Sequence, residues 1–409
     1  MGRSFIYKLQ GLTLFAYILL YSTGTLCTDM MGLPESSLFV VKFGVFLCLS
    51  LALFFSRSER IVPKTINIFV ALCFLFYTFQ LLVFQNTNIL RQYVNLAIFY
   101  FIATYSNKHL YYYLEFSILF CTILLSLQVL YLGLTMGGEV YYHREEAFVD
   151  KPYFTHLYTL TYIICFSNIL KNNNRHIYMP VLLFTMVINL WIVHSKISLF
   201  MAFAYVLTIT LFGNKQLKKK LMAYVKIGLI IVPILIYLFP DILLPDEIKF
   251  GLNTITGSNM FQVDASISKQ EQMGNTYEIR GAMWIYCMSL FFANPLFGIG
   301  IGNFEETNAR SGNFFSDITE TESSLLSIIV EGGIIYLLMF LYLFIIVLRK
   351  AYYNFTRYNT IQDIVAFGIF FSYAIMIIGN DFFDSLFWLV SGYLAFIICD
   401  NRELCKTKK

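Results

Sequence analysis

Charged residues are scarce in this chain of 409 residues: they make up 13% of it, while 58% of the residues are hydrophobic and 18% are aromatic. Soluble domains carry about a quarter charged residues and less than half apolar ones. The mean hydropathy of +0.66 points the same way. This composition excludes most soluble folds, and it also excludes intrinsic disorder and collagen-like repeats.

Cysteine and proline are also sparse, with eight of each. No Cys-x-x-Cys pair occurs, so the sequence offers neither a zinc site nor a redox motif, and we expect no metal and no cofactor. No internal repeat stands out, which gives no support to an inverted-repeat transporter. The basic cluster at 215–220 is typical of a short loop that sets membrane topology, so we expect no nucleic acid among the partners.

Long apolar runs fill most of the chain. A helix of ~20 residues crosses a ~30 Å bilayer core, and about twelve runs of suitable length follow one another. They are residues 10–27, 37–56, 65–84, 89–105, 110–135, 153–170, 177–193, 197–212, 222–240, 323–348, 362–379 and 384–399. The stretch from 177 to 212 would be ~54 Å long as one helix, so it predicts two helices with Lys196 at their turn. The expected fold is an all-α polytopic membrane protein with about 12 transmembrane helices.

The basic residues indicate the direction of the chain. With a cytoplasmic N-terminus, about 20 of the 29 Lys and Arg residues fall on the inner side, which is the positive-inside pattern. Both termini are then cytoplasmic. No cleavage site follows the first run, so we expect a retained anchor and not a signal peptide.

This orientation also predicts three regions. Transmembrane helices occupy 1–240, one long external loop occupies 241–322, and further helices with a cytoplasmic tail occupy 323–409. If the apolar segment 282–301 crossed the membrane, the basic loops that follow it would lie on the outer side. We therefore expect it to be a helix that lies on or dips into the outer face.

The external loop contains the polar residues that are most informative about function. In it, Pro295 is followed by glycines at 298, 300 and 302 and then by Asn303, a stretch in which a helix does not continue. Either the glycines allow the backbone to approach a ligand closely, or they form a tight structural turn. No βαβ unit surrounds them, so this is not a dinucleotide fingerprint.

Few cations remain on the outer side, so each of them is informative. Arg280 and Lys196 suit a phosphate or pyrophosphate headgroup, for which Arg offers a bidentate fork. Alternatively, both are interfacial cations whose stems cover apolar surface. His194 lies beside Lys196 at the same predicted turn.

Two carboxylates stand at the entry to the tenth apolar run. Glu322 lies where the external loop enters the membrane, and Glu331 lies roughly 13 Å deeper if the segment is helical. An ionisable residue at that depth is a functional-site hypothesis. The alternative is that Glu331 caps a polar network or pairs with Lys196.

These residues resemble the O-antigen ligase and polymerase superfamily of bacterial envelope proteins, and the Wzy-type polymerases in particular. The family's Arg, Trp, Asn-Pro and Phe-Gly-Ile-Gly-x-Gly elements match Arg280, Trp284, Asn294, Pro295 and residues 297–302. Its upstream Ser-Arg element matches Ser195 and Lys196, and the element that opens the next span matches Glu322, Glu331 and Gly333. Lys196 stands where the family usually has Arg. Glu322 stands where the ligases have a His proposed as the catalytic base, which favours a polymerase.

The resemblance implies a GT-C-like, metal-independent glycosyltransferase of the bacterial inner membrane that works at the periplasmic face. The donor would be a glycan on undecaprenyl pyrophosphate, and the acceptor would be a sugar hydroxyl of another lipid-linked repeat unit. A chain-length regulator and a flippase are the protein partners that it implies.

In such a transfer, fixed cations stabilise the departing pyrophosphate and a base takes the proton of the acceptor hydroxyl, which gives the residues expected roles. The catalytic residues would be Glu322 and Arg280, and the residues that bind pyrophosphate or glycan would be Lys196, Arg310, Asn303, His194 and Glu331. Two alternatives stay open: an O-antigen ligase that moves glycan onto lipid A-core, and a polysaccharide flippase or other transporter.

Overall fold

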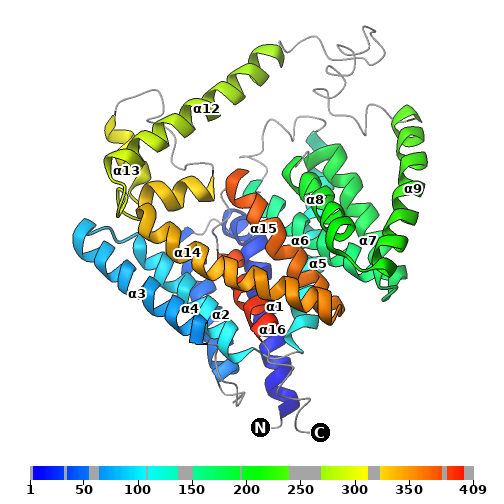
Figure 1. Cartoon of the computed structure of the whole chain (residues 1–409), viewed down its shortest axis with the longest axis horizontal. Helices are drawn as coiled ribbons and strands as arrows, with labels where there is room; N and C mark the ends of the chain where they lie inside the picture. Colours follow the sequence, from blue (N-terminus) through cyan, green and yellow to red (C-terminus); the bar gives the residue numbers. More distant parts are fainter. Residues whose placement is uncertain are drawn as a thin grey trace. The chain divides into compact units, whose positions relative to one another are not determined.

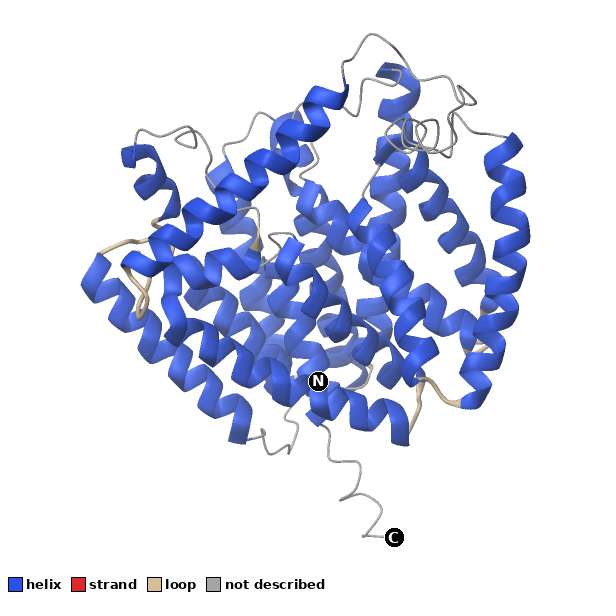
Figure 2. Cartoon of the chain, turned by 45° about the horizontal axis from the view of Figure 1, so that its top comes forward, coloured by secondary structure: helices blue, strands red, loops and turns tan. Residues whose placement is uncertain are grey.

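The computed structural model of the chain describes residues 3–31, 35–54, 64–106, 109–136, 151–193, 196–238, 269–311, 323–379 and 385–399, and for some helical residues it describes the backbone alone. The described residues form helices and a few short loops, and no strand occurs among them (Figure 2). The all-helical fold that the sequence predicts is confirmed for these residues.

The helices follow the apolar runs closely (Figure 1). In chain order they are α1 (Arg3–Met31), α2 (Glu35–Phe54), α3 (Lys64–Phe84), α4 (Ile89–Tyr105), α5 (Leu110–Met136), α6 (Lys151–Leu170), α7 (Arg175–Ile188), the π-helix η2 (Asn189–Val193), α8 (Lys196–Phe212), α9 (Lys215–Leu238), α12 (Lys269–Ala293), α13 (Phe304–Ser311), α14 (Ser324–Arg357), α15 (Ile361–Gly379) and α16 (Ser385–Cys399). Each predicted run falls on one helix, or on α7 together with η2.

Several described helices are suited to a membrane by their length and composition. Among the described residues, 5 segments are long and apolar enough to cross one: Phe5–Ser22, Lys64–Phe84, Leu110–Tyr131, Ser324–Arg357 and Ile361–Ile378. Shorter apolar helical segments are Val40–Phe54, Phe154–Leu170, Arg175–Ile188, Ile197–Phe212, Gly281–Ala293 and Leu386–Ile398. These segments fit a polytopic membrane protein.

The chain divides into two compact units, and the first comprises residues 1–121 and 286–409. Helix α16 lies in the core of this unit, where the segment Leu386–Ile398 is buried throughout and packs most closely on α4. Around it, α14 packs on α15 and α3, and α1 packs on α2. A helix that is apolar on all sides is typical of a protein core or of a membrane span.

The second unit comprises residues 122–285, and α6 is its central helix. Helix α6 packs on both α7 and α8. Hydroxyl groups join it to α5: the Thr122 and Thr161 hydroxyls lie 2.7 Å apart, and the Ser126 and Tyr158 hydroxyls lie 2.6 Å apart. Polar side chains of this kind hold helices together where no water competes for them.

The helix bounds show which conformation is adopted by two segments that the sequence singled out. The stretch from 177 to 212 forms two helical arms, as predicted: the first ends with η2 at Val193, and the second begins at Lys196. The apolar segment 282–301 is helical only as far as Ala293. Helix α12 begins at Lys269, well before the apolar pattern does, and from Asn294 the chain turns, as Pro295 and the glycines predict.

Candidate functional site

The glycine-rich stretch forms a loop of residues 294–303 that joins α12 to α13 within the first unit (Figure 1). The loop packs against a break in α14. At this break Gly333 has φ 66° and ψ −168°, outside the helical region, while the residues on either side are helical. Helix α14 therefore consists of two helical pieces that meet beside the loop.

Main-chain hydrogen bonds join the loop to the break. The Ile299 amide donates to the Val330 carbonyl at 2.9 Å, and the Gly300 amide donates to the Glu331 carbonyl at 3.1 Å. On the other side of the break, the Ile334 amide donates to the Pro295 carbonyl at 2.9 Å. An unpaired backbone group in an apolar surrounding is costly, so the loop satisfies groups that the break would otherwise leave exposed.

Glycine is required at two of the contact points. A Cβ at Gly298, where φ is 68°, would lie 2.4 Å from the Glu331 carbonyl oxygen. A Cβ at Gly333 would lie 2.5 Å from the Leu296 carbonyl oxygen. Both distances are far shorter than van der Waals contact, and a positive φ disfavours other residues as well. Of the two readings of the glycine run, the structure supports the tight structural turn.

Three amide side chains at the end of α3 and in the turn before α4 also hold the loop. The Gln80 side chain is buried and its Nε2 donates to the Phe297 carbonyl at 2.8 Å. Asn88 Nδ2 donates to the Gly302 carbonyl at 3.4 Å, and Asn86 Nδ2 donates to Asn303 Oδ1. Sequence reasoning missed these residues, because Asn86 and Asn88 are typical of any loop between two apolar runs.

The predicted site residue Asn303 is part of this network. Its Oδ1 accepts from Asn86, and its Nδ2 donates to the Ile299 carbonyl at 3.0 Å. Both ends of its side-chain amide are therefore bonded within the loop and to the turn that supports it. Direct contact of this side chain with a glycan stays a prediction.

Glu331 lies two residues before the break in α14, and its side chain is half-buried. Its carboxylate accepts a hydrogen bond from the Phe304 amide at 3.3 Å, which is the first amide of α13. A carboxylate is favourable at a helix N-terminus because that end carries partial positive charge. Glu331 thus joins α14 to the start of α13.

Arg310 lies on the exposed side of α13. It forms an ion pair with Glu306, one helical turn earlier, and both side chains are largely accessible. Exposed pairs of this kind contribute little to stability. The Arg310 guanidinium is therefore placed where a ligand outside the helix can reach it.

The other predicted site residues lie at the edge of the described chain or beyond it. Glu322 and His194 lie outside the described residues. Arg280 lies on α12, and Lys196 is the first residue of α8. For these two residues the structure describes the backbone alone. Arg280 precedes the buried Cys287 by seven residues, which is about two helical turns.

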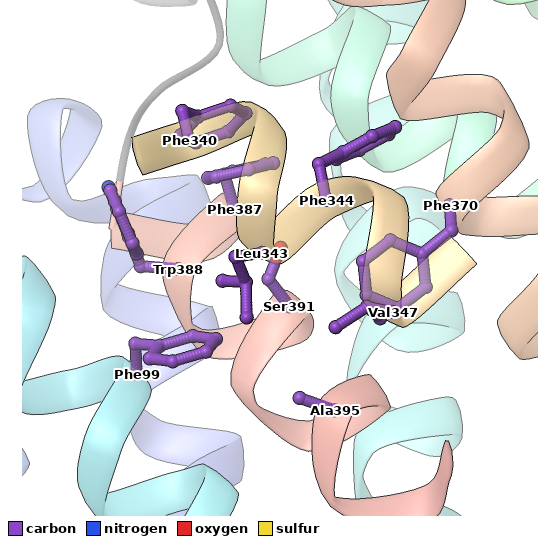
Figure 3. Close-up of a pocket in the computed structure, with 10 residues that line it drawn as sticks. All are labelled: Phe99, Phe340, Leu343, Phe344, Val347, Phe370, Phe387, Trp388, Ser391 and Ala395. Carbon is purple, nitrogen blue, oxygen red and sulfur yellow. The ribbon is translucent and has the colours of Figure 1, made fainter. Parts of the chain in front are cut away.

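An apolar pocket in the first unit lies among α4, α14, α15 and α16 (Figure 3). Its volume is about 20 Å³, room for about one water molecule. Its lining is mainly aromatic and includes Phe99, Phe340 and Trp388, with Ser391 as its polar member. A charged glycan carrier finds no complementary group there, so we do not place the site in this pocket.

No cluster of three or more His, Cys, Asp and Glu side chains that could hold a metal ion occurs in the described part of the chain. The chemistry of the described site residues is that of amides, one half-buried carboxylate and one exposed guanidinium. These groups bind, orient and stabilise charge.

Comparison with known proteins bears on the same region. Residues 181–341 match the O-antigen ligase family. The match begins in α7 and ends in α14 beyond the break at Gly333, so it includes the glycine-rich loop. The resemblance to the O-antigen ligase and polymerase superfamily is thereby confirmed over about two fifths of the chain. No curated protein sequence matches the chain significantly.

All the site residues that the sequence predicts lie inside the region that matches the O-antigen ligase family. They are His194, Lys196, Arg280, Asn303, Arg310, Glu322 and Glu331. Gln80, Asn86 and Asn88, which hold the loop, lie outside it. The match supports an integral membrane enzyme of glycan transfer.

Proposed function

We propose that the protein polymerises undecaprenyl-pyrophosphate-linked oligosaccharide repeat units into a surface polysaccharide, as an O-antigen polymerase. The match of residues 181–341 to the O-antigen ligase family carries the proposal of glycan transfer. The choice of a polymerase rests on Glu322, which stands where the ligases that the sequence resembles have a His.

The proposed reaction is a direct glycosyl transfer. The hydroxyl oxygen of the acceptor sugar forms a bond to the anomeric carbon of the donor, and the bond from that carbon to pyrophosphate breaks. Glu322 takes the proton of the acceptor hydroxyl, as a general base does. Negative charge grows on the departing undecaprenyl pyrophosphate, and Arg280 and Lys196 stabilise it there, with Arg310 as a further cation. No metal ion takes part in the proposed step.

The remaining predicted residues have supporting roles in this proposal. His194 binds glycan or pyrophosphate beside Lys196. The hydrogen bonds of Asn303 and Glu331 support a role in which they keep the loop and α13 in place next to the bound glycan. Rigid support of this kind is what a binding site requires of its surroundings.

The proposed setting follows from the charge pattern of the sequence. About twelve helices cross the inner membrane, both termini are cytoplasmic, and the loop with residues 241–322 faces the periplasm. The segment of α12 from residue 282 lies at or dips into the outer face. A flippase that delivers the repeat units and a chain-length regulator are the expected protein partners.

Replacement of Arg280 by alanine tests the role of the leaving-group cation. We expect Arg280→Ala to abolish long-chain polysaccharide, through a loss of about 10²- to 10³-fold in kcat, at unchanged protein level. Arg280→Lys, which keeps the charge but loses the fork, should retain short chains. The matched control is Arg349→Ala, because Arg349 is an exposed residue of α14 that has no part in the proposed chemistry. A normal chain-length ladder from Arg280→Ala would overturn the assignment.

A ligase is the second candidate, because the matched family is named for that activity. Deletion of the gene separates the two. A strain without the polymerase still carries a single repeat unit on its core lipid, whereas a strain without the ligase carries none. Polymer formation by purified protein in the absence of an ion gradient would exclude pure transport.

A further inference from the structure

The start of α8, whose first residue is Lys196, is held by a buried group of three polar side chains in the second unit. Asn189 is the first residue of η2, Ser198 is the third residue of α8, and Tyr162 lies on α6. All three side chains are fully buried. Burial of a polar side chain costs free energy unless the side chain is hydrogen-bonded. The stability of this apolar helical unit therefore depends on the hydrogen bonds of these three residues.

Asn189 connects the other two. Its Nδ2 group donates one hydrogen bond to the Ser198 hydroxyl at 2.7 Å and one to the Tyr162 hydroxyl at 3.0 Å. The Tyr162 hydroxyl donates in turn to the Thr185 carbonyl on α7 at 3.4 Å. One amide group therefore links η2, α6 and α8.

The bond from Asn189 to Ser198 also shows that no continuous helix runs through both residues. Nine residues of a continuous helix would separate the two Cα atoms by ~13.5 Å, too far for a direct hydrogen bond between these short side chains. The helix is therefore interrupted between these two residues, where the first arm ends at Val193 and the second begins at Lys196. Lys196 is two residues from one end of this bond.

The π-helix adds a second observation at the same place. Residues Asn189–Val193 form η2, and the wider π turn directly precedes the interruption. Single π turns inside helices occur often at functional sites, because the extra residue changes the direction of the side chains that follow. Asn189 lies where α7 passes into this turn.

We infer that Asn189, with Tyr162 and Ser198, is a positioning residue for Lys196 in the transfer reaction, an inference that rests on the proposed function of Lys196. A lysine has a long and flexible stem, so the position of its charge depends on the position of its backbone. The Asn189–Ser198 bond fixes the first turn of α8, which begins with Lys196. A cation stabilises a developing charge most when it is held in place beforehand.

The chain supplies a matched control on the same two helices. The Ser167 hydroxyl of α6 and the Tyr205 hydroxyl of α8 lie 2.6 Å apart, and both residues are also buried. Tyr205 lies seven residues beyond Ser198, about two helical turns farther from the interruption. Ser198→Ala and Ser167→Ala thus each remove one buried, hydrogen-bonded hydroxyl, as do Tyr162→Phe and Tyr205→Phe.

The test compares these variants in a transfer assay and in a binding assay with undecaprenyl pyrophosphate in detergent. Asn189→Ala, Ser198→Ala and Tyr162→Phe should lower kcat/KM about 10- to 100-fold and weaken binding, because small misplacements of a catalytic group have large effects. Ser167→Ala and Tyr205→Phe should lower the melting temperature to a similar extent but change kcat/KM less than about twofold.

A double-mutant cycle then shows whether Asn189 acts through Lys196. In a Lys196→Ala background, Asn189→Ala should lower activity by less than about a further twofold. If Asn189→Ala does not fold, the same cycle is read with Ser198→Ala. Equal losses in the paired variants, a full additional loss in the Lys196→Ala background, or full activity of Lys196→Ala alone would each overturn the inference.

Failure of the proposed function is seen separately. Wild-type protein that forms no polymer from lipid-linked repeat units would contradict the polymerase assignment. The binding of undecaprenyl pyrophosphate, compared across the same paired variants, then tests the positioning role by itself. Weaker binding by Ser198→Ala than by Ser167→Ala supports that role, and equal binding overturns it.

Discussion

The glycine-rich loop of the first unit and the start of α8 in the second unit are held by different kinds of contact. The loop at residues 294–303 is joined to the break in α14 by main-chain hydrogen bonds, and glycines allow the close approach. The start of α8 is held by hydrogen bonds between side chains, with Asn189 at their centre. Both regions carry residues that the sequence predicts for one reaction.

The difference determines which kinds of substitution disrupt each region. Main-chain pairing does not depend on the side chains of the paired residues, so the loop tolerates their loss but not an added Cβ at the contact points. The start of α8 depends on polar atoms of side chains, so it fails when those atoms are removed. An added Cβ at the contact points should therefore have the largest effect on the first region, where the loss of a supporting side chain has a smaller one, and deleted polar atoms should have the largest effect on the second.

The largest effect is expected at Gly298 in the first region. Gly298→Ala should destabilise the protein by about 3 kcal/mol or more, because the new Cβ collides with the main chain at Glu331 and φ is positive. The level of folded protein in the membrane and its melting temperature in detergent measure this.

The control for Gly298 is Gly44 on α2, where a Cβ meets nothing within 4 Å. Gly44→Ala should leave the melting temperature unchanged or raise it, since alanine is the better helix former. If Gly298→Ala melted at the temperature of the wild type, the close packing of the loop on α14 would be wrong.

A moderate effect is expected at Gln80, a side chain that supports the loop. Gln80→Leu should destabilise the protein by about 1–3 kcal/mol, because the Phe297 carbonyl loses its buried donor. Asn88→Ala is the matched variant: Asn88 also donates to a loop carbonyl, but it is exposed and its bond is longer. It should cost about 0.5 kcal/mol or less. Similar melting temperatures for the two variants would contradict the buried role of Gln80.

The smallest effect on stability is expected at Arg310. Arg310→Gln should change the free energy of unfolding by less than about 0.5 kcal/mol, since its pair with Glu306 is exposed. It should nevertheless raise the KM for the lipid-linked donor several-fold if the guanidinium binds pyrophosphate as proposed. Glu306→Gln removes the same ion pair but leaves the cation, so its KM should not rise. An equal rise in both variants would remove Arg310 from the site.

The sequence predicts the helices well, because runs of about twenty apolar residues have few other stable arrangements in a membrane. It also predicts the end of α12 before Pro295 and the two arms on either side of Lys196. The early start of α12 at Lys269 was missed, because residues 269–280 are mostly polar and do not look like a membrane helix.

The support of the candidate site was predictable only in part. Glycines and charged residues are conspicuous in an apolar chain, so the loop and Glu331 were found from the sequence. The break at Gly333 lies within an apolar run, and Gln80, Asn189 and Ser198 are single polar residues in such runs. Their roles come from tertiary contacts between distant helices, which a local pattern does not record.

The most direct test of the proposed function uses purified protein with undecaprenyl-pyrophosphate-linked repeat units as the only substrate. The wild type should form a ladder of polymers and release one undecaprenyl pyrophosphate for each new linkage, without added metal or an ion gradient. Arg280→Ala should release none, while Arg349→Ala should match the wild type. Absence of polymer from the wild type, or equal release from Arg280→Ala, would contradict the proposal.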